Sequence, residues 1–584
     1  MNEAHKKKGM SRRQFLTLAG GLTGSVALNS MGIFNGWSTN KPEVAVDKLG
    51  YQENEADVLV IGSGMAALFA AVKAHDAGAK VLMVSKGRLG TSGMTPFAKG
   101  IFAYDPKTAK VSLDEFTAAV SRSALGTNNP VYTRQMAEHS LARVNELKEW
   151  GFFNSPLCFN AFNTPSTSRN IPIIERVMIT HLIKENGRIA GAAGFSVDEE
   201  AIRFFKAKTV ILCTGAGGFK PNGFPICDLT HDGTIMAYNI GAKVTGKEWN
   251  DGHPGQAENA ADCFTGWHGM FERTPGTTGV EVHHDLGVET NYTAYMKGNP
   301  IHGGPPGTGQ IIQGGPYRPA EFVENRYSSG EGAPQRDGGP PHDGPPPRDG
   351  GAPGPGMAGT PVGGSSAGMS IHKSEGLVPI NEKCESTIPG LYAAGDALGS
   401  YMAGAIYTQV GSSLAGSAVQ GAIAAEAAAE YCKGIEMPDI PKSTVSAVQE
   451  EILAPLKRTS GYGPAWVTQT LQGIMIPNFV LYIKKESLLK AALAYIEELR
   501  DHHMPLLRAA DMHELRLAHE TANMILTAEM KLKASIMRTE SRCSHYRLDY
   551  PDMDDKNWRA WINIHKSSDG RMQFEKQAFD AWPE

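Results

Sequence analysis

Residues 57–86 read DVLVIGSGMAALFAAVKAHDAGAKVLMVSK, and this stretch decides the fold. Asp57 to Ile61 is an apolar run typical of a buried strand, and Met65 to Ala77 is an alanine-rich run that predicts a helix ending before Gly78. Val81 to Val84 predicts a second strand. A strand, a glycine turn, a helix and a strand within about 30 residues are typical of the βαβ unit of a dinucleotide site.

The turn of this unit reads Gly62-x-Gly64-x-x-Ala67. Gly62 permits the tight turn, Gly64 lets a pyrophosphate approach the backbone, and the small Ala67 lets the helix pack on the strand. The helix N-terminus would then offer N–H groups to the phosphates. The acid that usually binds the adenosine ribose, about 20 residues further on, is replaced here by Ser85-Lys86. This unit alone therefore leaves NAD and FAD both open.

Two later glycine-rich strand ends favour FAD. The first is TVILCTGAGG, from Thr209 to Gly218, and the second is IPGLYAAGD at 388–396. Two further segments that contact the nucleotide indicate an extended cofactor. FAD extends beyond the nucleotide that one βαβ unit holds.

The order of eight motifs resembles the flavoprotein family of fumarate reductase and succinate dehydrogenase, which also includes aspartate oxidase and 3-ketosteroid dehydrogenases. The matching pieces are GSGMAA, SKGRLGTSGMTPFAKG, GRIAGAAGF, TVILCTGAGG, THDGTIMAYNIGAKV, IPGLYAAGD, GSSLAGS and ESRCSHYRLDYPDMDDKNW. They run from about residue 55 to 250 and from about 375 to 560. The resemblance implies an α/β fold: a Rossmann-like FAD-binding domain with an inserted α+β capping domain and a C-terminal helical domain.

The resemblance also predicts the residues that contact FAD, with Asp396 at the ribityl hydroxyls. The predicted contacts are Gly62, Gly64, Ala67, Ser85, Lys86, Ser92, Thr214, Gly215, Asp232, Asp396, Ser412, Ser413 and Leu414. Relatives bound to membranes attach FAD through a histidine that follows a serine, whereas this chain has Ser92-Gly93 at that place. We therefore expect non-covalent FAD.

The expected domain boundaries follow from these motifs and from composition. They are a signal segment at 1–36, the first part of the FAD-binding domain at 55–249, a capping or substrate region at 250–375, the second part of the FAD-binding domain at 376–435, and a C-terminal helical domain at 436–584. A stretch near 328–360 is dominated by Gly and Pro and predicts a disordered insertion. A partner-docking loop is the alternative for this stretch.

The N-terminal segment predicts export. Ser11-Arg12-Arg13 followed by Phe15-Leu16 resembles a twin-arginine signal, which exports proteins already folded. The alternatives are a membrane anchor or a basic tail, but the apolar run is short and rich in Gly and Ser for a membrane span. We therefore expect the protein to be periplasmic or otherwise exported.

Composition and cysteine spacing restrict the partners. The formal net charge of −5 shows no excess of positive charge of the kind that binds nucleic acid. The seven cysteines contain no C-x-x-C, which argues against haem, iron–sulfur or zinc carried on this chain. Electrons therefore require a separate redox partner, such as a cytochrome, an iron–sulfur protein or a quinone-linked membrane subunit.

Two further departures from the family concern the substrate. Gly404-Ala405-Ile406-Tyr407 stands where the family has G-A-N-R, whose arginine grips a carboxylate. A tyrosine cannot make that bidentate contact. The family's histidine before its M-G-G segment is also missing, since the region reads GGSSAGM, and His253-Pro254 lacks the following threonine. A fumarate or succinate enzyme is therefore not expected.

The predicted catalytic residues are Tyr407 and His253. Tyr407 either acts as the proton donor or acceptor or packs as an aromatic wall, and His253 either contacts the substrate or is structural. The predicted function is an exported FAD-dependent oxidoreductase that reduces or desaturates a C–C bond of a small organic substrate. The alternatives are a flavoprotein electron-transfer subunit of a larger redox complex and a non-enzymatic FAD-binding protein.

Overall fold

The computed structural model describes most of the chain outside the N-terminal segment and the region before residue 375. The described residues are 37–38, 44–220, 226, 228–250, 254–257, 274–278, 280, 360–363, 369–370, 375–399, 401–405, 409, 411–476, 480 and 483–581. The signal segment and the stretch at 328–359 lie outside them. No helix among the described residues is long and apolar enough to span a membrane.

A seven-stranded sheet with the order β5-β3-β2-β8-β7-β6, in which β16 also pairs with β8, forms the centre of the molecule. Its strands are β2 Gly50–Ile61, β3 Val81–Val84, β5 Ile173–Ile174, β6 Val177–Glu185, β7 Arg188–Ser196, β8 Ala201–Leu212 and β16 Leu391–Ala393. The paired strands among β5, β3, β2, β8 and β16 run parallel to one another, whereas β7 is antiparallel to both β8 and β6. The parallel strands therefore bring their carboxyl ends to one edge.

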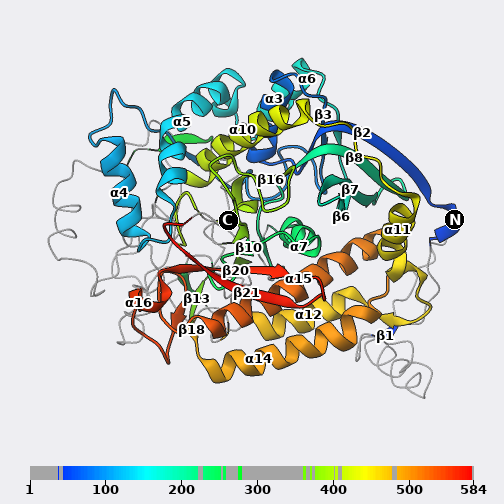
Figure 1. The fold of residues 1–584 in the computed structure, drawn as a ribbon. Coiled ribbons are helices and arrows are strands. Elements are labelled where there is room, and N and C mark those ends of the chain that lie inside the picture. The colour runs from blue at the N-terminus through cyan, green and yellow to red at the C-terminus, as the bar shows by residue number, and fades with distance from the viewer. Residues whose placement is uncertain are drawn as a thin grey trace, which may run out of the picture.

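Two helices pack closely against each other over this sheet (Figure 1). They are α3 Met65–Asp76 and α10 Ser412–Lys433, and α5 Pro130–Glu149 packs on α10. Small residues permit the close approach, since a Cβ at Gly421 of α10 would collide with the backbone of Ala66. The Gly and Ala residues of α10 thus form a face that packs against α3.

The sequence-based elements agree with the structure around the βαβ unit. The helix ends at Asp76 and the second strand has the predicted bounds, whereas the first strand begins at Gly50 rather than at Asp57. The hairpin between β6 and β7 turns at Asn186-Gly187. Both residues of that turn have positive φ, which suits Asn-Gly. The prediction of an α/β fold with a Rossmann-like domain is confirmed.

The C-terminal part is mainly helical. Its helices are α11 Lys442–Lys457, α12 Pro464–Met475, α14 Glu486–Glu498 and α15 Met512–Met537. The helices α12, α14 and α15 pack on one another in the lower part of Figure 1 and bury a separate apolar cluster that includes Leu471, Leu489 and Ile525. These helices bear out the predicted helical character of this region.

The last residues form strands that the sequence analysis did not predict. A four-stranded sheet has the order β15-β10-β20-β21, with bounds β15 Gly376–Leu377, β10 Val244–Thr245, β20 Ala560–Lys566 and β21 Met572–Ala578. The end of the predicted helical region thus pairs with a strand that precedes the capping region. The remaining main helices are α4 Leu113–Ser123, α6 Phe159–Ser168, α7 Asp232–Asn239 and α16 Asp555–Trp558.

Candidate functional site: a dinucleotide pocket at the carboxyl edge of the sheet

A pocket opens where the parallel strands β2, β3, β8 and β16 end. Its lining includes Ile61 at the end of β2, Ser85 after β3, Cys213 after β8 and Ala394 after β16. Ligands of open α/β sheets bind at this edge, because the turns after parallel strands leave a crevice there. The pocket also receives the first residues of α3 and of α10.

Most of the predicted cofactor contacts come together in this pocket. Its lining contains Gly62, Gly64, Ser85, Lys86, Ser92, Thr214, Gly215, Asp232, Asp396, Ser413 and Leu414. Ala67 does not line it but is buried on α3. Ser412 is buried at the start of α10, where its hydroxyl donates to the carbonyl of Gln409 at 2.7 Å. The predicted catalytic residues Tyr407 and His253 lie outside the described residues.

The glycine turn after β2 admits no side chain at its first position. Gly62 has φ +129°, and a Cβ there would overlap the carbonyl oxygen of Cys213. Gly64 caps α3 without a side chain, and a Cβ at this position would meet the hydroxyl of Thr95 at 3.1 Å. Packing against Cys213 therefore requires glycine at the first position, and both glycines line the pocket.

A second helix N-terminus faces the same pocket. Gly411 caps α10 with φ +79°, and a Cβ there would lie 2.6 Å from the backbone nitrogen of Phe102. The next residues Ser413, Leu414 and Ser417 line the pocket. Since each N-terminus carries a partial positive charge, the two helices α3 and α10 favour an anionic ligand between them.

Lys86 lies at the edge of the pocket in a buried ion cluster. Its Nζ donates to Asp232 Oδ2 at 2.6 Å, to Glu520 Oε1 at 2.9 Å and to Thr230 Oγ1 at 3.0 Å. Burial opposes the charge on the lysine, but the two carboxylates outweigh it and raise the pKa of Lys86 above its usual range. Lys86, which follows β3, thus pairs with two carboxylates and also lines the pocket.

Glu520, on α15, is the member of this cluster that the sequence analysis missed. Its side chain is fully buried, and it also pairs with Lys220 at 2.6 Å. Three residues further along the helix, Asn523 donates to Asp232 Oδ1 at 2.8 Å. No local pattern in the sequence marks Glu520, because its partners Lys86 and Lys220 lie in other segments of the chain. The C-terminal helical region therefore contacts two residues of the pocket lining, Lys86 and Asp232.

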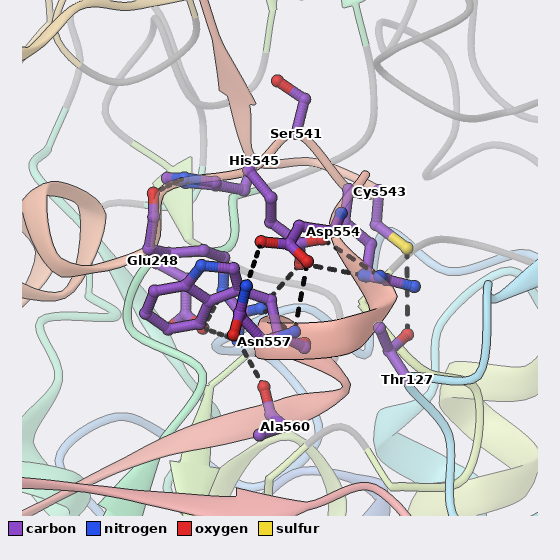
Figure 2. A network of polar contacts seen from close by, with 12 residues as sticks. Thr127, Glu248, Ser541, Cys543, His545, Asp554, Asn557 and Ala560 are labelled. Atoms are coloured by element: carbon purple, nitrogen blue, oxygen red, sulfur yellow. Dashed lines mark hydrogen bonds and ion pairs between the residues drawn. The ribbon is translucent and has the colours of Figure 1, made fainter. Parts of the chain in front are cut away.

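A second buried network lies in the C-terminal segment ESRCSH. Glu540 accepts a bidentate pair of hydrogen bonds from Arg542, at 2.9 and 3.0 Å, and another from Arg538 at 2.8 Å. Arg538 also reaches Glu248, at 3.0 Å, and the backbone N–H of Asp554 donates to Glu540 at 2.8 Å. Figure 2 shows these side chains from separate parts of the chain converging on one point. The network joins the end of α15 to the segment after β10.

The sequence matches two protein-family profiles. The family described as FAD binding domain matches residues 57–165, and the family described as fumarate reductase flavoprotein C-term matches residues 468–583. The first match contains the glycine turn, and the second contains Glu520 and the ESRCSH segment. The two matches therefore cover the glycine turn that lines the pocket and the helix α15 that contacts Lys86 and Asp232.

Curated relatives are similar over nearly their whole length. An uncharacterized FAD-dependent oxidoreductase of Methanocaldococcus jannaschii is 26% identical, covering 89% of this chain and 98% of the relative. One subunit of the fumarate reductase (CoM/CoB) of Methanothermobacter marburgensis is 24% identical, covering 88% and 97%. L-aspartate oxidase of Streptomyces coelicolor is 23% identical, covering 88% and 92%.

Solved structures share the fold. E. coli quinol fumarate reductase FrdA superposes with a TM-score of 0.68 at 18% identity, covering 91% of this chain and 97% of that one. Adenylylsulfate reductase of Archaeoglobus fulgidus superposes with a TM-score of 0.65 at 21% identity, covering 94% and 99%. The predicted arrangement of an FAD-binding domain with additional capping and helical parts is consistent with these folds.

The residues of the pocket fit FAD, the cofactor of this chain. The glycine turn lines the pocket, and the hydroxyl of Thr214 in the lining is buried without a hydrogen-bond partner among the described residues. An extended ligand that crosses from the α3 turn to the α10 N-terminus would meet both features. Gly62, Gly64, Ser85 and Thr214 are placed to hold it.

Proposed function

We propose that this chain, an FAD-dependent oxidoreductase that resembles the flavoproteins of fumarate reductase and succinate dehydrogenase, reduces or desaturates a C–C bond of a small organic substrate other than fumarate or succinate. Bound FAD supplies the hydride acceptor or donor. The observation that carries the proposal is Tyr407, at the place where the family pattern has an arginine that grips a carboxylate. Without that guanidinium, a dicarboxylate loses its bidentate partner.

The described part of the same loop is held in place as far as Ala405. Ala405 is buried, and its backbone N–H donates to Thr127 Oγ1 at 2.8 Å. A tyrosine can give or take the proton at the carbon beside the hydride transfer when its surroundings lower its pKa. We assign that role to Tyr407 and a substrate contact to His253.

We further propose that FAD is held without a covalent bond. Gly93 stands where membrane-bound relatives have the attachment histidine, and no described residue that lines the pocket is a histidine. The purified protein is expected to stay yellow on desalting and to release its flavin on denaturation. Flavin that remains with the precipitated polypeptide would contradict this assignment.

The substrate proposal is tested by oxidising reduced viologen in the presence of a panel of enoates and enones. We expect turnover with a compound that carries a C=C bond next to one activating group, and no turnover with fumarate. Turnover of fumarate at a rate above all other compounds would overturn the proposal. A flavin that is reduced and reoxidised without any substrate in the panel favours an electron-transfer role in a larger complex instead.

With a substrate identified, Tyr407→Phe is expected to lower kcat by about 100-fold or more, because it removes the proton that the reaction needs. The measurement is steady-state kinetics with the flavin content of each variant determined. Tyr401→Phe, in the same loop, is the matched control and is expected to keep kcat within about twofold. An unchanged kcat for Tyr407→Phe would leave an aromatic wall as its role.

Export by the twin-arginine route and a separate redox partner complete the proposal. Arg12-Arg13 with the following Phe15-Leu16 supports the first, and the lack of a C-x-x-C motif supports the second. Replacing both arginines by lysine is expected to keep the folded, flavin-loaded protein inside the cytoplasm of a bacterial host. Equal amounts of wild-type and variant protein in the exported fraction would contradict this route.

A further inference from the structure

Four ionisable side chains meet in a fully buried cluster that the proposed function does not use. The Oε1 atom of Glu375 lies 2.6 Å from His231 Nδ1, and its Oε2 atom lies 2.9 Å from Lys247 Nζ. The Nζ atom of Lys531 lies 3.8 Å from the same Oε2 atom. We call these four residues the Glu375 cluster. Each is 1% exposed or less, so water screens their charges little.

The Glu375 cluster adjoins the pocket on the side of α7. His231 caps this helix, directly before Asp232, which lines the pocket. Lys247 Nζ donates to Thr234 Oγ1, on the first turn of α7, at 3.4 Å, and Met236 further along the helix also lines the pocket. The first turn of α7 therefore contacts both the pocket and the cluster.

The segment that carries Glu375 also reaches the pocket lining from a second side. Glu375 directly precedes β15, and a Cβ at Gly376 would lie 2.4 Å from the carbonyl carbon of Leu398. Leu377 and Leu398 form a parallel bridge. Since Leu398 lies two residues after Asp396, which lines the pocket, Glu375 is one residue away from a backbone contact with the pocket segment.

Near neutral pH the Glu375 cluster holds one more positive charge than negative charge. Burial lowers the pKa of His231, which leaves its imidazole neutral. Burial opposes ionisation of Glu375, but Lys247 beside it holds the pKa of this carboxyl below its usual range. The ammonium groups of Lys247 and Lys531 therefore face a single carboxylate.

Lys531, on α15, is the lysine that is less well paired. Its Nζ donates to the carbonyl oxygens of Lys247 and Trp249, at 3.0 and 2.9 Å, and burial lowers its pKa to about 8. The charged and titratable groups that face it come from α7, from the segment after β10, from the residue before β15 and from β18 Ile483–Lys484: His231, Lys247, Glu248, Glu375 and Lys484. Glu375 is the only carboxylate within 4 Å of it among the residues that the structure describes.

The neighbouring acids do not neutralise this excess charge. Glu248 accepts from Arg538 Nε at 3.0 Å, and Glu540 accepts from Arg542 Nε at 2.9 Å, in the network of Figure 2. Two guanidinium groups and two carboxylates thus balance one another there. The remaining neighbour, Lys484, is itself a base. The positive charge of the Glu375 cluster is therefore left to act on its surroundings, which include the pocket.

We propose that the Glu375 cluster, through the charge on Lys531, raises the reduction potential of the bound FAD. When FAD takes up two electrons from a redox partner or from dithionite, together with one proton, it gains one negative charge. A buried positive charge beside the pocket favours this reduced form over the neutral oxidised ring system. The role does not depend on which substrate the enzyme uses.

Lys531→Met is the main test, because it keeps the length of the side chain and removes the charge. At about pH 6.5 the midpoint potential is expected to fall by about 30 mV, which is a tenfold lower ratio of reduced to oxidised flavin at a fixed potential for a two-electron couple. The measurement is a dithionite titration of the FAD-loaded protein against reference dyes. At about pH 9.5, where wild-type Lys531 has lost its own proton, the difference is expected to shrink to less than half.

A double variant separates charge from structural damage. Lys531→Met/Glu375→Gln leaves Lys247 as the single charge of the cluster, so the net charge equals that of wild type. The midpoint potential at about pH 6.5 is expected to return toward the wild-type value, whereas damage from the two substitutions would accumulate. Glu529→Gln is the control on the same helix: its partners are partly exposed, and the potential is expected to stay unchanged.

The outcomes decide the proposal independently of the substrate screen. An unchanged potential in Lys531→Met at about pH 6.5, an equal shift at both pH values, or the same shift in Glu529→Gln would overturn it. If Lys531→Met yields no flavin-loaded protein, wild type decides alone. Its potential is expected to fall more steeply with pH just above about pH 8 than below, since reduction then also brings a proton onto Lys531. A constant slope through this range would equally overturn the proposal.

Discussion

Replacing Gly62 by alanine is expected to abolish FAD binding and to leave little folded protein. Gly62 has φ +129°, a conformation that L side chains rarely adopt, and its Cβ would overlap the carbonyl of Cys213 at the end of β8. Neither backbone can move without breaking the pairing of β2 with β8. The strain and the overlap together cost about 3–5 kcal/mol, a large share of a protein's stability of about 5–15 kcal/mol.

Gly78→Ala is the matched control for this prediction. Gly78 also has a positive φ, of +90°, but no atom lies within 4 Å of the position of an added Cβ. Its substitution is expected to cost about 1 kcal/mol and to leave the flavin bound. The measurements are the yield of soluble protein, the ratio of flavin to protein after desalting, and the Tm. A Gly62→Ala protein with full flavin content and a Tm near that of Gly78→Ala would contradict the geometry described for the turn.

Glu520→Ala is expected to destabilise the protein by about 3 kcal/mol and to weaken FAD binding. The substitution leaves the buried Lys86 with one carboxylate fewer and removes the partner of Lys220. Breaking a buried ion pair from one side leaves an uncompensated charge, which typically costs about 3–5 kcal/mol. Because Lys86 also lines the pocket, a displaced lysine disturbs the cofactor. Urea unfolding of the FAD-loaded protein and flavin titration of the apoprotein measure the two effects.

The control for this variant lies on the same helix. Glu529 is itself buried, but its partners Arg500 and Lys533 are 28% and 30% exposed and water can solvate them in its absence. Its loss is therefore expected to cost about 1 kcal/mol and to leave flavin affinity unchanged. An equal effect of Glu520→Ala and Glu529→Ala on flavin affinity would show that α15 acts only as a packing element.

The cluster of Lys86, Asp232 and Glu520 determines how the stability of the protein depends on pH. Burial opposes ionisation of Glu520, but Lys86 beside it lowers the pKa of the carboxyl below its usual value. A carboxyl with a lowered folded pKa stabilises the protein above its unfolded pKa, and this contribution is lost as the pH falls through the folded pKa. Wild type is therefore expected to lose stability more steeply than Glu520→Gln below about pH 4.5.

The sequence allowed the βαβ unit and the pocket edge to be predicted because both depend on local patterns. The glycine spacing, the bounds of β3 and the turn at Asn186-Gly187 are set within a few residues. The motif order placed Thr214, Asp396 and Leu414 beside this turn, and the structure brings them to one pocket.

The features that could not be predicted from the sequence depend on contacts between residues far apart in the chain. Glu520 reaches Lys86 across 434 positions, so its charge looks like that of any surface helix until the fold is known. The strand β10 has two residues and no periodicity to detect, and β20 pairs with it only through tertiary contact. Glu375 likewise has no local signal, because its charged partners lie in three other segments.

The pairing of β20 with β10 has a consequence for how the chain folds during synthesis. Val244 pairs with Ile564, so this sheet cannot close until nearly the whole polypeptide has left the ribosome. Such long-range contacts slow folding, because the intervening chain must lose its freedom before they form. The four-stranded sheet therefore forms only when the C-terminus is present, and truncation there is expected to harm the nascent flavoprotein more than its distance in sequence suggests.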